Sequence, residues 1–170
     1  MRLLFLLFFP FLVNSQTVHQ DDGKIRYKGT VPFNKTLNGD VSNEIQASFI
    51  SAIKNAGKLI ETSADANRKF TAIGLFHLAS TAAVTNLATY LLTVEMEPDK
   101  YKFKIDSVSF VQEVRGGGKT TVINSKEFLE KMDETGDTAI ATEKVLNEFD
   151  MNVQKLLVMA NKELQKAIEK

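Results

Sequence analysis

Alternating apolar and polar residues dominate the middle of the chain, over residues 85–112. In the second half of this segment, Tyr101, Phe103 and Ile105 alternate with Lys102, Lys104 and Asp106. A period of two places the apolar set on one face of a β-sheet and the charged set on the other. Between the two halves, Pro98 and Asp99 suit the central positions of a type I turn. The pattern predicts a long β-hairpin.

The same alternation predicts strands before the hairpin. Apolar and polar residues alternate throughout residues 24–33. Residues 58–62 are a short strand candidate, and residues 69–80 would form a strand that is apolar on both faces. An alternative stays open in this region, namely a buried helix over residues 75–86, because that segment contains good helix formers. After the hairpin, the glycine-rich residues 113–121 are predicted to form a flexible loop.

Apolar residues at helical spacing predict three helices, over residues 41–56, 125–132 and 138–168. Asn124 and Glu127 have the spacing of a capping box at the start of the second helix. The third helix has one continuous apolar stripe, which comprises Leu146, Phe149, Val153, Leu156, Leu157, Ala160, Leu164 and Ile168.

Two uses of this stripe stay open. The simpler is that it covers the apolar face of the sheet, because a layered fold buries such a stripe against another element. Alternatively, part of the helix projects beyond the sheet and joins a partner or a second copy of the chain. The residues of that assembly helix would be Leu146, Phe149, Val153, Leu157 and Leu164.

The chain begins with the pattern of a secretory signal. Arg2 precedes an apolar run over residues 3–13, and residues of acceptable size follow at the cleavage position. The run is shorter than the roughly 20 apolar residues that a membrane span needs. We predict a signal peptide over residues 1–15, cleavage between Ser15 and Gln16, and export to a periplasm or the medium. No later segment approaches spanning length, so no membrane span is expected after cleavage.

Together these elements predict a single α+β domain over residues 24–170, preceded by a loose polar leader over residues 16–23. The expected architecture is a curved antiparallel sheet of about five strands. One helix from the N-terminal half and the long C-terminal helix are expected to pack on it.

Several segments resemble a family of secreted bacterial domains of unknown function with a TBP-like fold. They are KIRYKGTVPF at 24–33 with the helix that follows it, KFTAIG at 69–74 and VEMEPDKYKFKIDSVSF at 94–110. The resemblance implies a TBP-like core over residues 24–112 and a helical extension over residues 124–170. It implies no catalytic residues, and similarity of fold alone does not imply DNA binding.

The composition of the chain argues against several kinds of functional site. The chain of 170 residues has 21 basic and 21 acidic residues, a balance that argues against nucleic-acid binding through counterion release. It has no cysteine, which excludes disulfides, thiolate metal sites and cysteine nucleophiles. The RGGGKT segment at 115–120 lacks the first glycine of a phosphate loop, where Glu113 stands. We therefore predict no catalytic, cofactor-binding or metal site.

The second hairpin strand has one irregularity. Strict alternation would place Val108 and Phe110 on the charged face. Either a bulge near Asp106 changes the phase of the strand, or that face carries an exposed apolar patch. In the second case it would be a ligand or partner face, comprising Lys102, Lys104, Asp106, Val108 and Phe110.

Three functions follow from these patterns. The first is a small secreted, non-enzymatic binding or accessory module whose partner is an unknown protein or envelope ligand. The second is a self-associating structural or assembly protein of the cell envelope, a homo-oligomer. The third is a hydrolase that uses Glu95, Glu97 or Asp106, which requires these carboxylates to converge in one pocket.

Overall fold

The computed structural model describes residues 14–19, 24–33, 41–65, 68–133 and 135–168, with the backbone alone at 14–19 and 167–168. Most of the predicted signal peptide, residues 1–13, lies outside the described residues, as does part of the predicted leader. The elements in chain order are β1 (Asn14–His19), β2 (Ile25–Pro32), α1 (Ser42–Ala56), β3 (Lys58–Ala64), β4 (Lys69–Leu78), β5 (Val84–Met96), β6 (Lys100–Val114), β7 (Thr120–Asn124), α2 (Ser125–Met132) and α3 (Asp137–Ile168).

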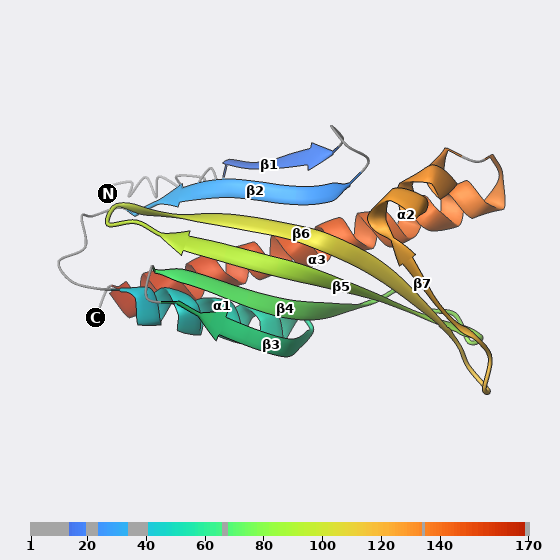
Figure 1. Ribbon diagram of the computed structural model, residues 1–170, viewed down its shortest axis with the longest axis horizontal. Helices are drawn as coiled ribbons and strands as arrows, with labels where there is room; N and C mark the ends of the chain where they lie inside the picture. The colour runs from blue at the N-terminus through green and yellow to red at the C-terminus, as the bar shows by residue number, and fades with distance from the viewer. Residues whose placement is uncertain (1–13, 20–23, 34–40, 66–67, 134, 169–170) are drawn as a thin grey trace, which may run out of the picture.

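The described strands form one seven-stranded antiparallel sheet in the order β1-β2-β6-β5-β4-β3, with β7 also paired to β6 (Figure 1). The α+β class and the long hairpin are confirmed. The predicted number of about five strands was too low. The structure adds β1, which spans the end of the predicted signal peptide and the start of the predicted leader, and β7, whose first two residues lie in the predicted loop of residues 113–121.

The alternative helix over residues 75–86 is wrong. Residues up to Leu78 belong to β4, and β5 begins at Val84 and pairs with β4 from Asn86 onward. Extended backbone suits this segment because β4 buries alternate side chains under the helices. Phe76 and Leu78, for example, are both 5% exposed or less.

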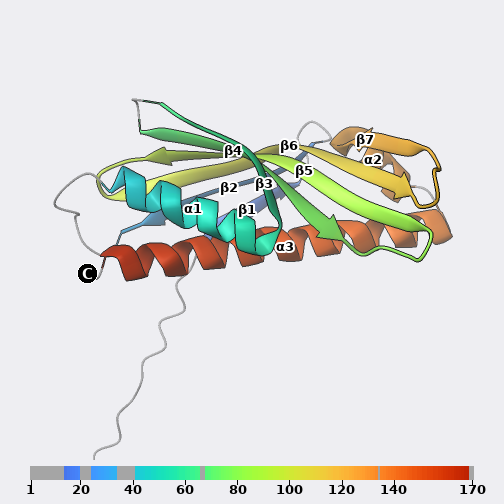
Figure 2. The ribbon, with the colours of Figure 1, turned by 90° about the horizontal axis from the view of Figure 1, so that it is seen from below.

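One face of the sheet is covered by α1 and α3, as Figure 2 shows. Phe149 of α3 lies at the centre of this layer, fully buried. Its ring centroid lies 5.6–6.4 Å from four other aromatic rings, those of Tyr27, Phe76, Tyr90 and Phe110. We call this side the covered face and the opposite side, which no helix covers among the described residues, the open face.

The predicted assembly residues of α3 are all part of this core. Their side chains are at most 6% exposed, the set being Leu146, Phe149, Val153, Leu157 and Leu164. The stripe therefore covers the sheet of its own chain, which is the simpler of the two predicted uses. In this fold it is not available to a second copy.

A β-bulge in β6 resolves the irregularity of that strand. Thr89 pairs with Ser109 and Leu91 with Asp106, so two residues of β6 lie opposite Tyr90 alone. One of the two, Ser107, has a φ of 52°, as expected for a residue that changes the phase of a strand. The predicted bulge is confirmed.

The alternative, an exposed apolar patch, is wrong. After the bulge, Val108 and Phe110 turn to the covered face, where each is 2% exposed. Lys102 and Lys104 stay on the open face and are exposed. The five residues proposed as one ligand face are therefore divided between the two sides of the sheet.

Candidate functional site

The long strand β6 shares one of its edges between two shorter strands. β2 pairs with it from Lys100 to Ile105, and β7 pairs with it from Ser109 to Glu113. Within the described part of the chain, no strand pairs with residues 106–108 on that edge. The bulge lies in this interval, so the sheet is split where β2 and β7 diverge.

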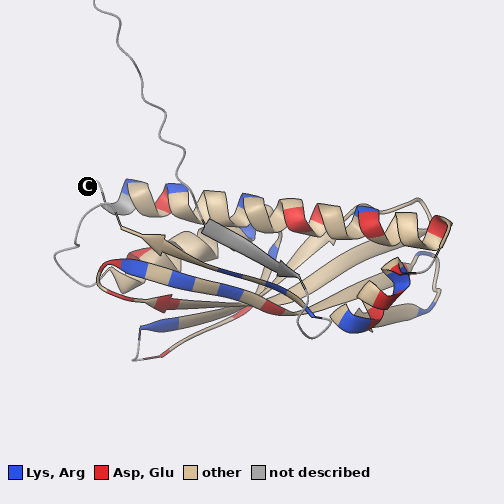
Figure 3. Cartoon of the chain, turned by 90° about the horizontal axis from the view of Figure 1, so that it is seen from above, with Lys and Arg blue, Asp and Glu red and all other residues tan. Residues whose placement is uncertain are grey.

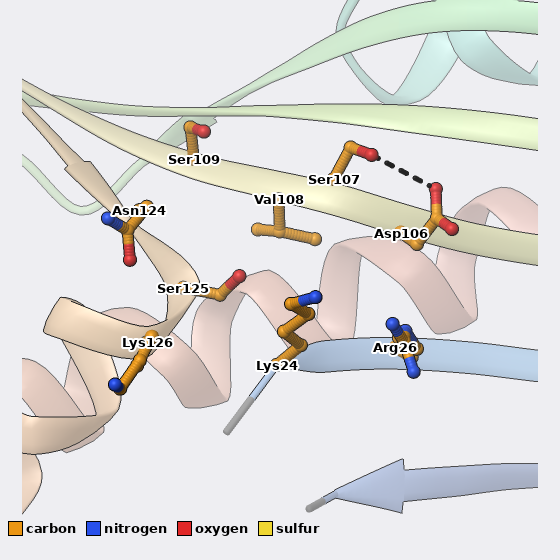
Figure 4. A pocket seen from close by; sticks show the side chains of 9 residues that line it. All are labelled: Lys24, Arg26, Asp106, Ser107, Val108, Ser109, Asn124, Ser125 and Lys126. Atoms are coloured by element: carbon orange, nitrogen blue, oxygen red, sulfur yellow. Dashed lines mark hydrogen bonds between the residues drawn. The ribbon is translucent and has the colours of Figure 1, made fainter. Parts of the chain in front are cut away.

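A cavity of about 470 Å³ occupies the split (Figure 4). A volume of this size lies within the range, roughly 300–1,000 Å³, of small-molecule sites. We call it the β2–α2 cleft. Its lining residues come from three segments of the chain and are Lys24, Arg26, Asp106, Ser107, Val108, Ser109, Asn124, Ser125 and Lys126.

The start of β2 supplies two cations to the cleft. Side chains two residues apart point to the same side of a strand, so Lys24 and Arg26 share a side. The alternate residues Ile25 and Tyr27 are each 1% exposed and hold the strand to the core. The Tyr27 hydroxyl donates a hydrogen bond to Asp150 of α3. Burial, together with this bond, raises the pKa of Tyr27.

The start of α2 supplies the opposite wall. The Asn124 side chain accepts a hydrogen bond from the backbone N–H of Glu127 at 3.0 Å, which confirms the predicted cap. One turn later, Phe128 stacks on Phe110 of β6, with ring centroids 3.7 Å apart. This stacking fixes the first turn, so that Ser125 and Lys126 stand beside the bulge.

The bulge itself contributes the single carboxylate of the lining, Asp106. Its carboxylate forms an ion pair with Lys104 and accepts a hydrogen bond from the Ser107 hydroxyl at 3.3 Å. The lining therefore contains three cationic side chains and one carboxylate, and the ion pairs of both Asp106 with Lys104 and Lys126 with Glu130 reach outside the cleft. The remaining polar groups are hydroxyls and an amide, which both donate and accept hydrogen bonds.

The predicted face residues lie around this cleft in different ways. Asp106 and Val108 line it, Phe110 lies beneath it in the core, and Lys102 and Lys104 lie beside it on the open face. In Figure 3, blue bands of basic residues alternate with uncharged positions along β6. Sequence reasoning missed the residues that β2 and α2 contribute, namely Lys24, Arg26, Asn124, Ser125 and Lys126.

The carboxylates of the hydrolase hypothesis do not converge. The Oε1 atom of Glu95 lies 4.0 Å from the Nζ atom of Lys69. Glu97 forms ion pairs with Lys100 and Lys102 near the hairpin turn. Hydrogen bonds from Lys102 and Lys100 lower the pKa of Glu97. Neither glutamate lines the cleft, so the geometry that this hypothesis requires is not found.

Two further observations concern the described residues only. They contain no group of three or more histidine, aspartate or glutamate side chains placed to hold a metal ion. None of their helices combines the length and the apolar character needed to cross a membrane.

No protein-family model and no curated protein matches this chain. Two crystal structures resemble it. A TBP-like protein from Parabacteroides distasonis has a TM-score of 0.63 at 13% identity, over 86% of this chain and 96% of the other. A DUF4468 family protein from Bacteroides ovatus has a TM-score of 0.57 at 14% identity, over 85% and 91%. At such identities the likeness concerns the fold alone, and it confirms that this chain has the predicted TBP-like fold.

Proposed function

We propose that this protein is an exported, non-enzymatic binding module that holds a small ligand in the β2–α2 cleft. One observation supports the proposal: three segments that are distant in the sequence line one cavity, and in each of them neighbouring side chains are buried in the core. A concave site with a few convergent polar groups is the usual form of a ligand site. Its lining is the basis of the proposal, because a fold alone does not specify a function.

The proposal that the module is not an enzyme rests on the side chains that line the cleft. General acid–base catalysis needs a titratable group that can exchange a proton with the substrate. The lining contains neither histidine nor cysteine, its two lysines are exposed to solvent, and its one carboxylate, Asp106, is held in an ion pair with Lys104. Cations, hydroxyls and an amide suit recognition of a polar ligand.

Binding is tested by recording amide NMR spectra of the exported chain with a panel of neutral, anionic and cationic small molecules. We expect the shifts to gather at residues 24–26, 106–109 and 124–126. A Ser109→Trp variant fills the cleft and should abolish them, whereas Thr93→Trp, on the open face of β5, should not. Shifts that survive Ser109→Trp would contradict the site, and turnover of any panel compound would contradict the non-enzymatic role.

Export rests on the signal pattern of residues 1–15. Expression of the full chain in a bacterium, followed by N-terminal sequencing of the periplasmic and extracellular fractions, tests it. We expect a chain that begins at Gln16. Recovery of the protein only in the cytoplasm with Met1 retained would refute the proposal.

Self-association is a second candidate function, carried by a different surface. Ile140, Met151 and Val158 are 59–67% exposed and are separated by 11 and 7 residues of α3. Those separations are close to whole helical turns, so the three side chains lie along one outer line. Sedimentation equilibrium of the exported chain beside Met151→Lys tests it. A concentration-dependent oligomer that the variant loses supports this function, and a strict monomer eliminates it.

A further inference from the structure

We infer that the chain has a second ligand site, which binds a neutral amide group on an apolar body. A cavity of about 560 Å³ lies where α2, the first turns of α3 and the connection between β4 and β5 meet the end of the sheet. Figures 1 and 2 show α2 beside the N-terminal part of α3 at this end. We call this space the end cavity. It shares no lining residue with the β2–α2 cleft, so its occupancy is independent of the proposed function.

The sheet wall of the end cavity is polar, although it continues the covered face. Ala88 of β5 and Phe110 of β6 are register partners in the core and are at most 2% exposed. Side chains two residues apart share a face of a sheet, so Asn86 and Gln112 lie on the same face beyond them. These two residues are also register partners, are half-buried and line the cavity. At this end the core therefore gives way to a pair of side-chain amides.

The orientation of both amides follows from one backbone carbonyl. The Ala79 oxygen can only accept, and the Asn86 Nδ2 atom donates to it at 2.6 Å. The Asn86 Oδ1 atom is thereby turned to Gln112, whose Nε2 atom donates to it at 3.2 Å. The Ser80 hydroxyl oxygen holds Asn86 in place, because it accepts from the Asn86 backbone N–H at 3.1 Å. Both amides thus donate in the direction of Ala79.

The open end of this chain of hydrogen bonds is the Oε1 atom of Gln112. It accepts no hydrogen bond from the residues that the structure describes. An amide that already donates has a more strongly polarised carbonyl, so the bonds along the chain strengthen this acceptor. A ligand beside Gln112 therefore has to bring a donor, since an acceptor would face another acceptor.

The other walls specify the rest of the ligand. Ile123 of β7 and Phe128 of α2 are 5% and 4% exposed, and with Val145 of α3 they form apolar lining against which an apolar body packs. Thr138, in the first turn of α3, lines the cavity with a hydroxyl that can donate. A trans secondary amide directs its N–H and its C=O to opposite sides. One such group is therefore suited to pair with Gln112 on the sheet and Thr138 on the helix.

The charged side chains of the lining do not select a ligand by its charge. Lys131 of α2 and Lys144 and Asp137 of α3 line the cavity, so both signs are present. Lys144 and Asp137 are exposed to solvent, where water weakens their attraction for a ligand. The hydrogen-bond chain that ends at Gln112 therefore specifies the ligand, and a charged probe is one arm of the test.

Three benzoyl probes that differ in one group test the inference. N-methylbenzamide has an N–H group, methyl benzoate has an ester oxygen in its place, and benzoate has a charge. Each is titrated into the exported chain and followed by amide NMR shifts at residues 79–81, 112 and 137–145. We expect N-methylbenzamide to bind about fivefold more tightly than either other probe, which is the order of one net neutral hydrogen bond.

A capped phenylalanine, with an amide on each side of the residue, distinguishes the two sources of such a group. Binding tighter than that of N-methylbenzamide would assign the site to a peptide. Weaker binding would assign it to a free small molecule, which a cavity of this volume accommodates.

Variants locate the effect. Gln112→Met keeps the length of the side chain but removes its amide, and it should abolish the preference for N-methylbenzamide over methyl benzoate. Gln154→Met, at an exposed position of α3 outside the lining, is the control and should keep that preference. Ala141→Trp fills the cavity from an exposed position of α3 and should abolish the shifts. Ala47→Trp, at an exposed position of α1, should not.

Four results would overturn the inference. Methyl benzoate or benzoate binds as tightly as N-methylbenzamide, or Gln154→Met removes the preference as fully as Gln112→Met does. Alternatively, the shifts survive Ala141→Trp, or all probes shift only residues 24–26, 106–109 and 124–126. The last result would place the probes in the β2–α2 cleft and would support the proposed function while the second site fails.

Discussion

The two faces of the sheet differ in how their side chains are buried. On the covered face, large side chains such as Tyr90 and Phe76 are at most 1% exposed and stack with ring centroids 4.5 Å apart. On the open face, Ile73 pairs with Leu91 across the strands and both stay half-buried. The covered face is determined by packing against the helices. The open face is free to carry charges, and it borders the cleft.

The bulge in β6 connects the two faces. Before it, the polar residues of β6 belong to the open face, and after it Val108 and Phe110 enter the core. The change of phase at Ser107 is also where the cleft forms. The bulge that brings Val108 and Phe110 into the core therefore also exposes the strand edge that a ligand could reach.

The contrast between core and outer surface is sharpest on α3. Phe149→Ala should lower the free energy of unfolding by about 3–5 kcal/mol, because it leaves a cavity among four aromatic rings. Met151→Ala, two residues away and 65% exposed, should change it by less than about 0.5 kcal/mol. Urea denaturation measures both. Equal effects would mean that α3 does not pack as described.

Gly74 of β4 is a closely packed position of the covered face. A Cβ atom at this position would lie 2.3 Å from the hydroxyl oxygen and ring of Tyr90. We expect Gly74→Ala to cost roughly 1–3 kcal/mol, since overpacking forces side chains or backbone to shift. Thermal unfolding measures the loss. Thr71→Ala on the open face of the same strand is the control and should cost clearly less.

Two buried tyrosines allow a comparison within the core. Tyr27 donates to Asp150, whereas the buried Tyr90 hydroxyl has no hydrogen-bond partner among the described residues. Tyr27→Phe should therefore cost about 0.5–3 kcal/mol, and Tyr90→Phe should be neutral or stabilising. Chemical denaturation of the two variants checks this order. A larger loss for Tyr90→Phe would contradict the assignment.

The smallest effect is expected on the open surface, at Glu97. Hydrogen bonds from Lys102 and Lys100 lower its pKa. The stability that its carboxylate contributes to the folded chain is therefore present above the ordinary glutamate pKa, and it is lost as the pH falls through the lowered pKa. Because the Glu97 side chain is 34% exposed and lies at the surface, Glu97→Gln should not measurably change stability at neutral pH. Urea denaturation at neutral and acidic pH, beside Glu61→Gln on β3, tests this. A large loss at neutral pH would contradict it.

Periodicity predicted most of the fold because it is a local signal. The hairpin, α1 and the stripe of α3 repeat apolar residues often enough to specify element and buried face. The strands β1 and β7 were missed because they are short and largely polar, with the sequences NSQTVH and TTVIN. Their extended form comes from pairing with β2 and β6.

The cleft could be predicted only in part. The mismatch of Val108 and Phe110 with strict alternation indicated a bulge, and Asp106 was named as a candidate. The contributions of Arg26 and Lys126 have no local signal. Both line the cleft because β2 and β7 occupy the same edge of β6, a result of strand order that no short stretch of the sequence contains.

The shared edge of β6 also bears on the order of folding. Residues 24 and 126 come together only after both β2 and the β7–α2 segment have docked on the hairpin, and contacts so distant in sequence close slowly. The hairpin and α1 can form from nearby residues, whereas the cleft requires nearly the whole chain. A ligand held there would bind the completed fold alone and would stabilise it against reopening.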